Sequence, residues 1–151
     1  MRHCARGFTL IELLVVVVLI AVASAVASLA LRDPAATQLE HEAARLAALF
    51  EAARAEARAS GIAVIWEPRT DPSQDLGFRF VGLPASSELP TRWLGSGVFA
   101  EVIGAPAVAL GPEPLIGAQR VVLRLDARSL ALATDGLGPF VVADDVEAER
   151  R

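Results

Sequence analysis

An apolar run of roughly 24 residues near the N-terminus constrains the fold of this chain more than any other feature. It extends from Phe8 to Leu31 and reads FTLIELLVVVVLIAVASAVASLAL. As an α-helix it would be about 36 Å long, which exceeds the ~30 Å hydrocarbon core of a bilayer. Arg2 and Arg6 precede the run and acidic residues follow it, which favours a cytoplasmic N-terminus. We therefore expect residues 8–31 to form a membrane-spanning helix and residues 32–151 to form one globular domain.

Two simpler interpretations of this run remain open at this point. A secretory signal has a shorter apolar region of about 7–15 residues, followed by a small-x-small cleavage site. Here the run is longer, and the alanines that resemble such a site, Ala21, Ala23 and Ala25, lie inside it. A plain signal anchor is the other interpretation, and it assigns no role to the acidic residue within the run.

That acidic residue is Glu12. A carboxylate inside a membrane helix costs a few kcal/mol, so it usually marks a function. Glu12 lies four residues after Phe8, one helical turn along. If the chain is cut after Gly7, Phe8 carries a free α-amine, and Glu12 is positioned to pair with the amine of a neighbouring subunit. Removing one partner of such a pair costs ~3–5 kcal/mol, so Glu12 would set the register between subunits.

The segment from Arg6 to Leu13, RGFTLIEL, resembles the processing and methylation motif of type IV pilins and type II secretion pseudopilins. The resemblance implies removal of residues 1–7 by a prepilin peptidase, which cleaves between Gly7 and Phe8, and N-methylation of Phe8. The mature chain would have 144 of the 151 residues. Loss of two arginines would take its net charge from −4 to −6. The only cysteine, Cys4, lies in the leader, so the mature fold cannot rely on a disulfide.

A second helix is expected after the apolar run. Asp33-Pro34 interrupts the helical pattern, and we expect helix over residues 37–60, with Gly61 as its stop. The expected buried stripe consists of Leu39, Ala43, Leu46, Phe50, Ala53 and Ala57. The charged residues expected off that stripe are Glu40, Glu42, Arg45, Glu51, Arg54, Glu56 and Arg58. The stripe is expected to pack on the chain's own sheet, and a free coiled-coil seam is the alternative.

After Gly61 the period of the pattern changes to two, which is typical of strands. The expected strands are Ile62–Glu67, Leu76–Val81, Val98–Ile103, Ala107–Leu110, Arg120–Asp126, Ser129–Thr134 and Phe140–Ala143. A hairpin is expected around Asp126-Ala127-Arg128. A long helix followed only by strands predicts an α+β fold, with the helix packed on an antiparallel sheet or a small sandwich. With the resemblance above, this is a pilin-like fold.

The stretch Leu110–Val142, LGPEPLIGAQRVVLRLDARSLALATDGLGPFVV, is similar to the H-type minor pseudopilin of type II secretion, in the family that groups GspH with FimT. The resemblance implies a minor pseudopilin, anchored in the inner membrane with its globular domain in the periplasm. Its implied partners are the prepilin peptidase, the major pseudopilin, other minor pseudopilins, the inner-membrane assembly platform and membrane lipid. A FimT-like minor pilin of a type IV pilus is the alternative.

No residue pattern predicts catalysis or a cofactor. The mature chain would hold one histidine, His41, on the expected helix, where a solvated surface position is typical. Four aspartates, Asp126, Asp135, Asp144 and Asp145, suggest calcium, but this ion takes six to eight oxygen ligands, and the first two are ordinary turn residues. We therefore predict neither a metal site nor a catalytic site.

Two further expectations concern partners. Trp66, in a strand pattern, is expected in the core. Trp93, in a loop, either folds back onto the core or serves as a partner anchor. Since phosphate contacts dominate affinity for nucleic acid, an acidic chain argues against a nucleic-acid partner.

Overall fold

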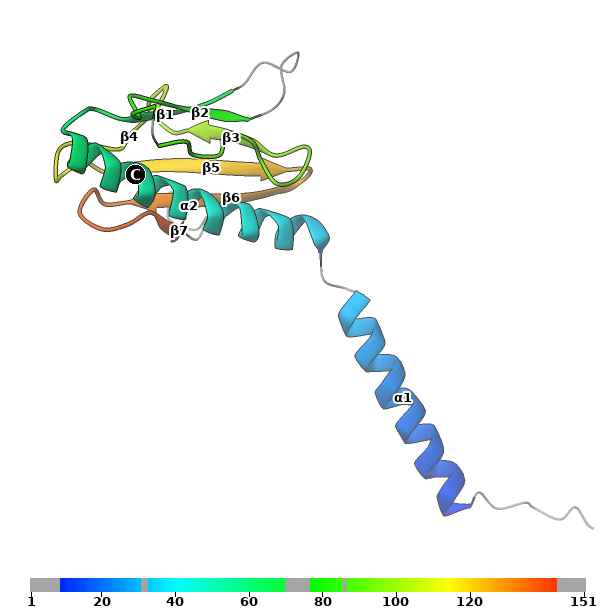
Figure 1. Ribbon diagram of the computed structural model, residues 1–151. Coiled ribbons are helices and arrows are strands. Elements are labelled where there is room, and N and C mark those ends of the chain that lie inside the picture. Colours follow the sequence, from blue (N-terminus) through cyan, green and yellow to red (C-terminus); the bar gives the residue numbers. More distant parts are fainter. Residues whose placement is uncertain (1–8, 31–32, 70–76, 86, 144–151) are drawn as a thin grey trace, which may run out of the picture. The chain divides into compact units, whose positions relative to one another are not determined.

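The computed structural model describes residues 9–30, 33–69, 77–85 and 87–143 (Figure 1). The chain divides into two compact units, Met1–Asp33 and Pro34–Arg151. In the first unit the described element is helix α1, Leu10–Ala30. The described part of the second unit contains helix α2, Pro34–Ser60, and seven strands.

Helix α1 begins with a side-chain cap. The Thr9 hydroxyl and carbonyl both accept the backbone N–H of Glu12, at 3.3 and 3.1 Å, which satisfies a donor that would otherwise lack a partner in the first turn. Every side chain from Thr9 to Ala25 is exposed. Within the described residues, no helix combines the length and apolar character required to cross a membrane. Phe8 and Leu31, which end the expected span, lie outside the described part of the chain.

Helix α2 begins at Pro34, three residues before its expected start. Proline is well suited to the first helical position, because its fixed φ matches the helix and its missing N–H would have no partner there. At the other end Gly61 has φ +68°, and its N–H donates to the Ala57 carbonyl at 2.9 Å. The predicted glycine stop is therefore confirmed.

The apolar stripe of α2 forms one side of the core. All six predicted stripe residues are buried. Phe50 lies at the centre, with its ring centroid 5.2 Å from that of Trp66 and 4.7 Å from that of Phe140. The predicted packing of this helix on the chain's own sheet is therefore confirmed. Two charged residues predicted to lie off the stripe, Glu42 and Arg54, are also buried, so that assignment was wrong for them.

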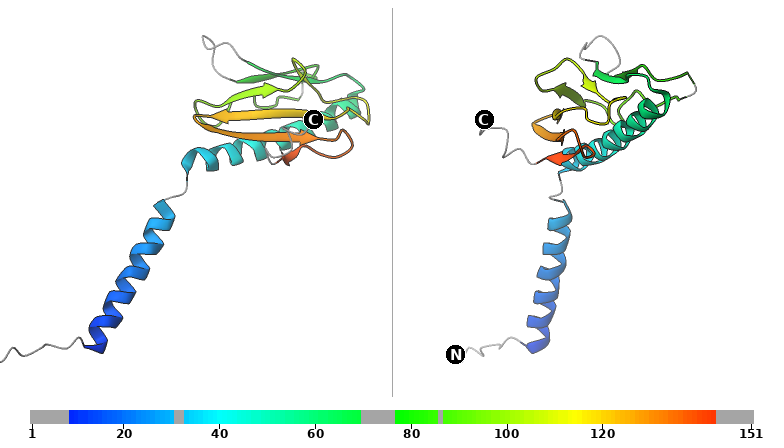
Figure 2. Two further views of the ribbon diagram at one scale, coloured as in Figure 1. Left: turned by 180° about the vertical axis from the view of Figure 1, so that it is seen from behind. Right: turned by 90° about the vertical axis from the view of Figure 1, so that its left-hand side faces the viewer.

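The strands form two antiparallel sheets with orders β2-β1-β4 and β3-β5-β6-β7. Their bounds are Ile65–Pro68 for β1, Phe78–Val81 for β2, Phe99–Val102 for β3, Val108–Ala109 for β4, Gln119–Leu125 for β5, Arg128–Thr134 for β6 and Val141–Ala143 for β7. Helix α2 lies across one face of the second sheet, against β5, β6 and β7 (Figures 1 and 2). Strand β1 lies near β3, and side chains from both sheets enter the same core.

The hairpin of β5 and β6 is the longest pairing in the sheets. It is in register from Gln119 opposite Thr134 to Leu125 opposite Arg128, with Asp126 and Ala127 as the turn. Asp126 has φ +52°, a left-handed conformation that aspartate tolerates better than most residues. Each predicted strand overlaps an observed strand, although Leu76 lies outside the described residues.

The predicted α+β fold, a helix packed on antiparallel sheets, is confirmed. Trp66 is fully buried, as predicted. Trp93 is half-buried, and its ring packs on Phe78 at a centroid distance of 4.8 Å. Of the two arrangements that the sequence left open, Trp93 therefore adopts the one in which its side chain folds back onto the core.

Candidate functional site

The predicted site residues lie at the start of the chain. Gly7 and Phe8 lie outside the described residues. Glu12 lies in the first turn of α1, where its backbone is held by Thr9 and its side chain is exposed. Its neighbours Leu10 and Ile11 are 84% and 70% exposed. A carboxylate surrounded by uncovered apolar side chains is suited to a contact with another apolar surface that brings its own cation.

In the globular unit, the buried carboxylate of Glu42 organises the loop that carries Trp93. Its Oε1 accepts the backbone N–H groups of Leu94 and Gly95, at 2.5 and 2.9 Å. Its Oε2 lies 3.6 Å from the Arg45 guanidinium, which also donates to the Arg92 carbonyl at 2.9 Å. Charged hydrogen bonds of this kind are stronger than neutral ones, so α2 fixes the position of residues 92–95.

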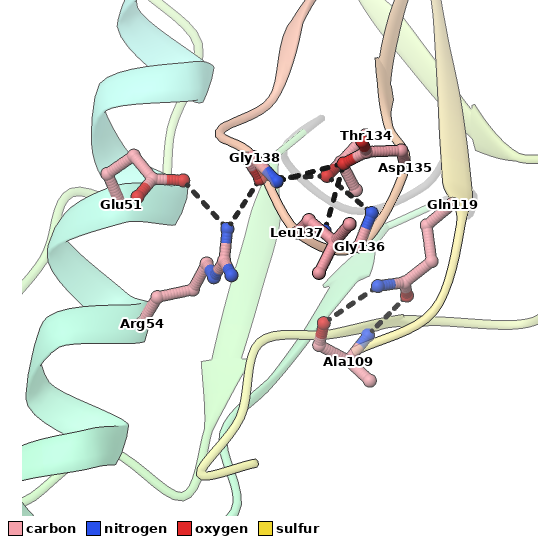
Figure 3. Close-up of polar contacts among 9 residues, drawn as sticks. All are labelled: Glu51, Arg54, Ala109, Gln119, Thr134, Asp135, Gly136, Leu137 and Gly138. Carbon is pink, nitrogen blue, oxygen red and sulfur yellow. Dashed lines mark hydrogen bonds and ion pairs between the residues drawn. The ribbon is translucent and has the colours of Figure 1, made fainter. Parts of the chain in front are cut away.

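A second buried charge, Arg54, links α2 to the loop before β7 (Figure 3). Its guanidinium donates to the Gly138 carbonyl at 2.9 Å and to the Glu51 carboxylate at 3.2 Å. The helix therefore holds both the loop at residues 92–95 and the loop at residues 135–139.

The loop at residues 135–139 is a compact turn closed by its own side chains (Figure 3). The Thr134 hydroxyl donates to the Gly138 carbonyl and accepts the Gly136 N–H, both at 2.9 Å. The Asp135 carboxylate accepts the N–H groups of Leu137 and Gly138, at 2.9 and 2.8 Å. These bonds, that of Gly138 first, hold the pKa of Asp135 below its ordinary value of 3.8.

Gly136 belongs to the same turn and has φ +91°. A Cβ placed on it would lie 2.6 Å from the backbone of Gly117. The Ile116 N–H donates to the Gly136 carbonyl at 3.5 Å. The turn is therefore packed directly against the loop before β5, and only glycine fits at this position.

Gln119 closes one edge of the first sheet with its side chain (Figure 3). Its amide oxygen accepts the Ala109 N–H at 2.7 Å, and its amide nitrogen donates to the Ala109 carbonyl at 2.9 Å. A neighbouring strand would offer the same pair of bonds. The side chain therefore occupies the position of a strand beside β4 and ties the two sheets together.

In the described part of the chain, no three histidine, cysteine, aspartate or glutamate side chains converge as metal ligands, and Asp144 and Asp145 lie outside it. His41 is exposed on α2. A half-open hollow of about 510 Å³ lies over β3 and β5. Its lining is Gly97, Phe99, Ala100, Glu101, Val122, Arg124 and Asp126, a set without a nucleophile and base pair.

Sequence reasoning missed Glu42, Arg54 and Gln119 as organising residues. A signal was present for the two charges, because Glu42 lies three residues after Leu39 and Arg54 lies four after Phe50, both stripe spacings. This spacing places both charges on the side of the helix that carries the stripe. Gln119 carries no comparable signal, since its partner at Ala109 is set by the meeting of two sheets.

The described chain thus has an exposed apolar helix with an early acidic residue, followed in the sequence by a helix packed on antiparallel sheets. Residues 2–28 match the model of the prokaryotic N-terminal methylation motif. Two crystal structures of the type IV minor pilin FimU from Pseudomonas aeruginosa strain PAO1 have a similar fold. One, in space group P21, matches with a TM-score of 0.55 and 13% identity, over 76% of this chain and 94% of that chain. The other, in space group P65, matches with a TM-score of 0.53 and 16% identity, over 74% of this chain and 98% of that chain. Among curated proteins, none matches the chain.

The chain therefore combines a pilin-type methylation motif with a pilin-like α+β fold. This motif implies processing by a prepilin peptidase and assembly with other pilins. It also implies a membrane-anchored N-terminal helix and a periplasmic domain.

Proposed function

We propose that this chain is a minor pseudopilin of a type II secretion system, assembled near the tip of a periplasmic filament that drives the export of folded proteins. The observation that carries the proposal is the methylation motif at residues 2–28, directly ahead of a globular unit with the fold of a minor pilin. The exposed apolar face of α1 supports it, because such a surface is stable only against lipid or other apolar helices.

In this proposal, cleavage after Gly7 creates the α-amine of Phe8, which is then methylated. Residues 8–31 anchor the subunit in the inner membrane until it enters the filament. Glu12 neutralises the α-amine of the adjacent subunit toward the tip, which fixes the axial register. The capped first turn of α1 supports this role, because it fixes the backbone from which the Glu12 side chain extends.

The alternative is a FimT-like minor pilin of a type IV pilus. The likeness to FimU supports this alternative at the level of fold. The preference for secretion rests on the similarity of Leu110–Val142 to the H-type minor pseudopilin. Both functions involve the same N-terminal processing and the same role for Glu12. They differ in whether the filament supports protein secretion or forms a surface pilus.

The first test is the N-terminal mass of the protein isolated from membranes, for the wild type and for Glu12→Ala. The proposal predicts a methylated Phe8 terminus in both proteins and loss of filament incorporation in the variant. Thr9→Ser is the matched control, because it keeps the hydroxyl cap of α1. An intact Met1 terminus with normal behaviour of Glu12→Ala would contradict the proposal and favour a plain signal anchor.

A deletion strain separates the two filament functions. Loss of secreted proteins from the medium, with surface pili retained, is expected for the pseudopilin. Loss of surface pili with normal secretion would instead assign the chain to a type IV pilus. Complementation with the wild type and with Glu12→Ala shows that the effect comes from this subunit.

A further inference from the structure

The loop at residues 92–96 of the globular unit presents a leucine to solvent. Leu94 is 69% exposed, while the ring of the preceding Trp93 packs on Phe78. A single exposed leucine is common on protein surfaces and has no meaning by itself. Leu94 differs in that a charged group from the interior of the protein holds its backbone in place, so its position is built into the fold.

Three hydrogen bonds with α2 fix the backbone behind this leucine. The carboxylate of Glu42, which is 1% exposed, accepts the N–H groups of Leu94 and Gly95 at 2.5 and 2.9 Å. The Gln38 amide donates to the Ser96 carbonyl at 3.5 Å. The loop backbone therefore faces α2, and the Leu94 side chain is exposed before any partner is present. A loop that is ordered in advance loses little conformational entropy on binding.

The sequence of this loop suits a lipid surface. Residues 89–98 read LPTRWLGSGV, in which the one charged residue is Arg92. Tryptophan is enriched where a bilayer meets water, and tryptophan and leucine are the apolar residues that peripheral helices bury there. A cationic residue beside them favours anionic head groups. The loop therefore combines an apolar tip with a basic flank and contains no acidic residue, which matches the head-group region of a membrane.

The loop also lies beside the first turns of α2 (Figure 1). Its partners Gln38 and Glu42 come four and eight residues after Pro34, which is about 6 and 12 Å along the helix. Helix α1 ends at Ala30, and the four chain steps from there to Pro34 span at most about 15 Å. The methylation motif implies that α1 is anchored in a membrane. The covalent chain therefore limits how far the loop can lie from that membrane.

We propose that the loop at residues 92–96 docks on the membrane surface through Leu94 and Trp93 while the subunit is held in the inner membrane. The inference rests on the proposed function, because the membrane anchor brings the loop to the lipid. Leu94 enters the head-group region, and Trp93 lies beside it with one side of its ring against Phe78. The buried carboxylate of Glu42 then has a role in this contact, since it holds the loop in the conformation that presents Leu94.

The test is tryptophan fluorescence of the full chain in vesicles of phosphatidylethanolamine and phosphatidylglycerol, with ordinary or brominated acyl chains. Bromine quenches a tryptophan only at short range, and the chain has two tryptophans. Trp66 is fully buried in the core and Trp93 is half-buried in the loop. We expect brominated lipid to quench the wild type several-fold more than Trp93→Phe, in which only the core tryptophan remains.

The matched variants are Leu94→Ser and Leu137→Ser, which remove two exposed leucines from the same unit. Leu137 is 72% exposed and lies in the turn that Arg54 holds, about 30 Å along α2 from Pro34. We expect Leu94→Ser to reduce the quenching of Trp93 several-fold and Leu137→Ser to leave it unchanged. Both variants should unfold in urea as the wild type does, because neither side chain belongs to the core.

Equal emission of the wild type in ordinary and brominated vesicles, with the protein retained in both, would overturn the inference. So would a Leu94→Ser variant that is quenched like the wild type but fails to enter filaments, because the leucine would then contact another subunit. Release of the wild type from the vesicles by an alkaline carbonate wash would instead contradict the membrane anchor. That result would reject the proposed function, and this inference with it.

Discussion

At the scale of single residues, the globular unit uses buried charges to hold its loops. Glu42 is 1% exposed and accepts the backbone N–H groups of Leu94 and Gly95 in the part-buried loop beside α2. Arg54 donates a hydrogen bond to the backbone carbonyl of Gly138. In both loops the backbone is irregular, so these groups have no partner in a helix or a sheet. The charged side chain provides the hydrogen bond instead.

Glu42→Ala is expected to lower the free energy of unfolding by about 3 kcal/mol, because it leaves a cavity in the core and removes the charged acceptor of two part-buried N–H groups. Glu42→Gln keeps one acceptor oxygen, so its loss should be smaller. Urea denaturation of the globular unit measures both, and Glu40→Ala, an exposed neighbour on α2, should stay within about 0.5 kcal/mol of the wild type. Equal effects at the two positions would show that the contacts of Glu42 contribute nothing.

Asp135 makes the stability of the unit depend on pH. Its pKa in the folded protein is held below the ordinary value of 3.8 by the N–H groups of Gly138 and Leu137. Its stabilisation is therefore present above that value and is lost as the pH falls through the lower, folded pKa.

Asp135→Asn keeps a side-chain oxygen for the same N–H groups but does not titrate. We expect the difference in unfolding free energy between wild type and variant to change as the pH is lowered below about 4. Denaturation series at several pH values measure this difference. A constant difference across that range would show that Asp135 carries no such linkage.

The six apolar positions of α2 could be predicted because burial of a helix face imposes its own period on the sequence. The burial of Glu42 and Arg54 could not be predicted from the polarity of the two residues. Each side chain is bonded to a loop that is distant in sequence, at Leu94 for Glu42 and at Gly138 for Arg54. Asp135 was recognised as a turn residue, but its bonds to Leu137 and Gly138 depend on the particular turn that forms.

At the scale of elements, the local sequence pattern predicted whether a segment is helix or strand better than it predicted where the segment begins and ends. The early start of α2 at Pro34 follows from the preference of proline for the first helical turn. The expected strands overlap the observed ones because alternation of apolar residues persists along them. The division of the strands into two sheets, and the clamp of Gln119 on Ala109, depend on pairings that no local pattern carries.

Gln119→Leu is expected to cost about 2 kcal/mol of unfolding free energy, since it removes two hydrogen bonds at similar side-chain volume. It also uncovers the edge of β4, so the variant should aggregate faster during refolding. Arg124→Ala on the same strand removes an ion pair with Glu101 in which both side chains are 60% exposed, and it should change stability little. Urea denaturation measures the loss of stability, and light scattering during refolding measures the aggregation. If Gln119→Leu is as stable and as soluble as Arg124→Ala, the side chain of Gln119 does not protect the edge of β4.

At the scale of the whole molecule, the core formed by the described residues lies in one of the two units. Each of these core residues, from Leu39 to Phe140, belongs to Pro34–Arg151. We therefore expect a protein of residues 33–151 to fold alone, with one cooperative transition in urea. Circular dichroism and tryptophan fluorescence should give coincident curves, and separate transitions for the two probes would contradict a single core.

The methylation motif could be recognised from the sequence because it is local and specific. The choice between a secretion pseudopilin and a minor pilin of a type IV pilus could not be made from the motif, since it depends on which subunits the globular unit contacts. The fold shared with FimU constrains the scaffold, and the surface residues determine the partners.

A core confined to one unit also affects the life history of the subunit. In the proposed filament, a subunit whose core is already packed would spend none of the free energy of assembly on ordering that core. The proposed filament would then be put together from subunits whose folded units are already finished parts.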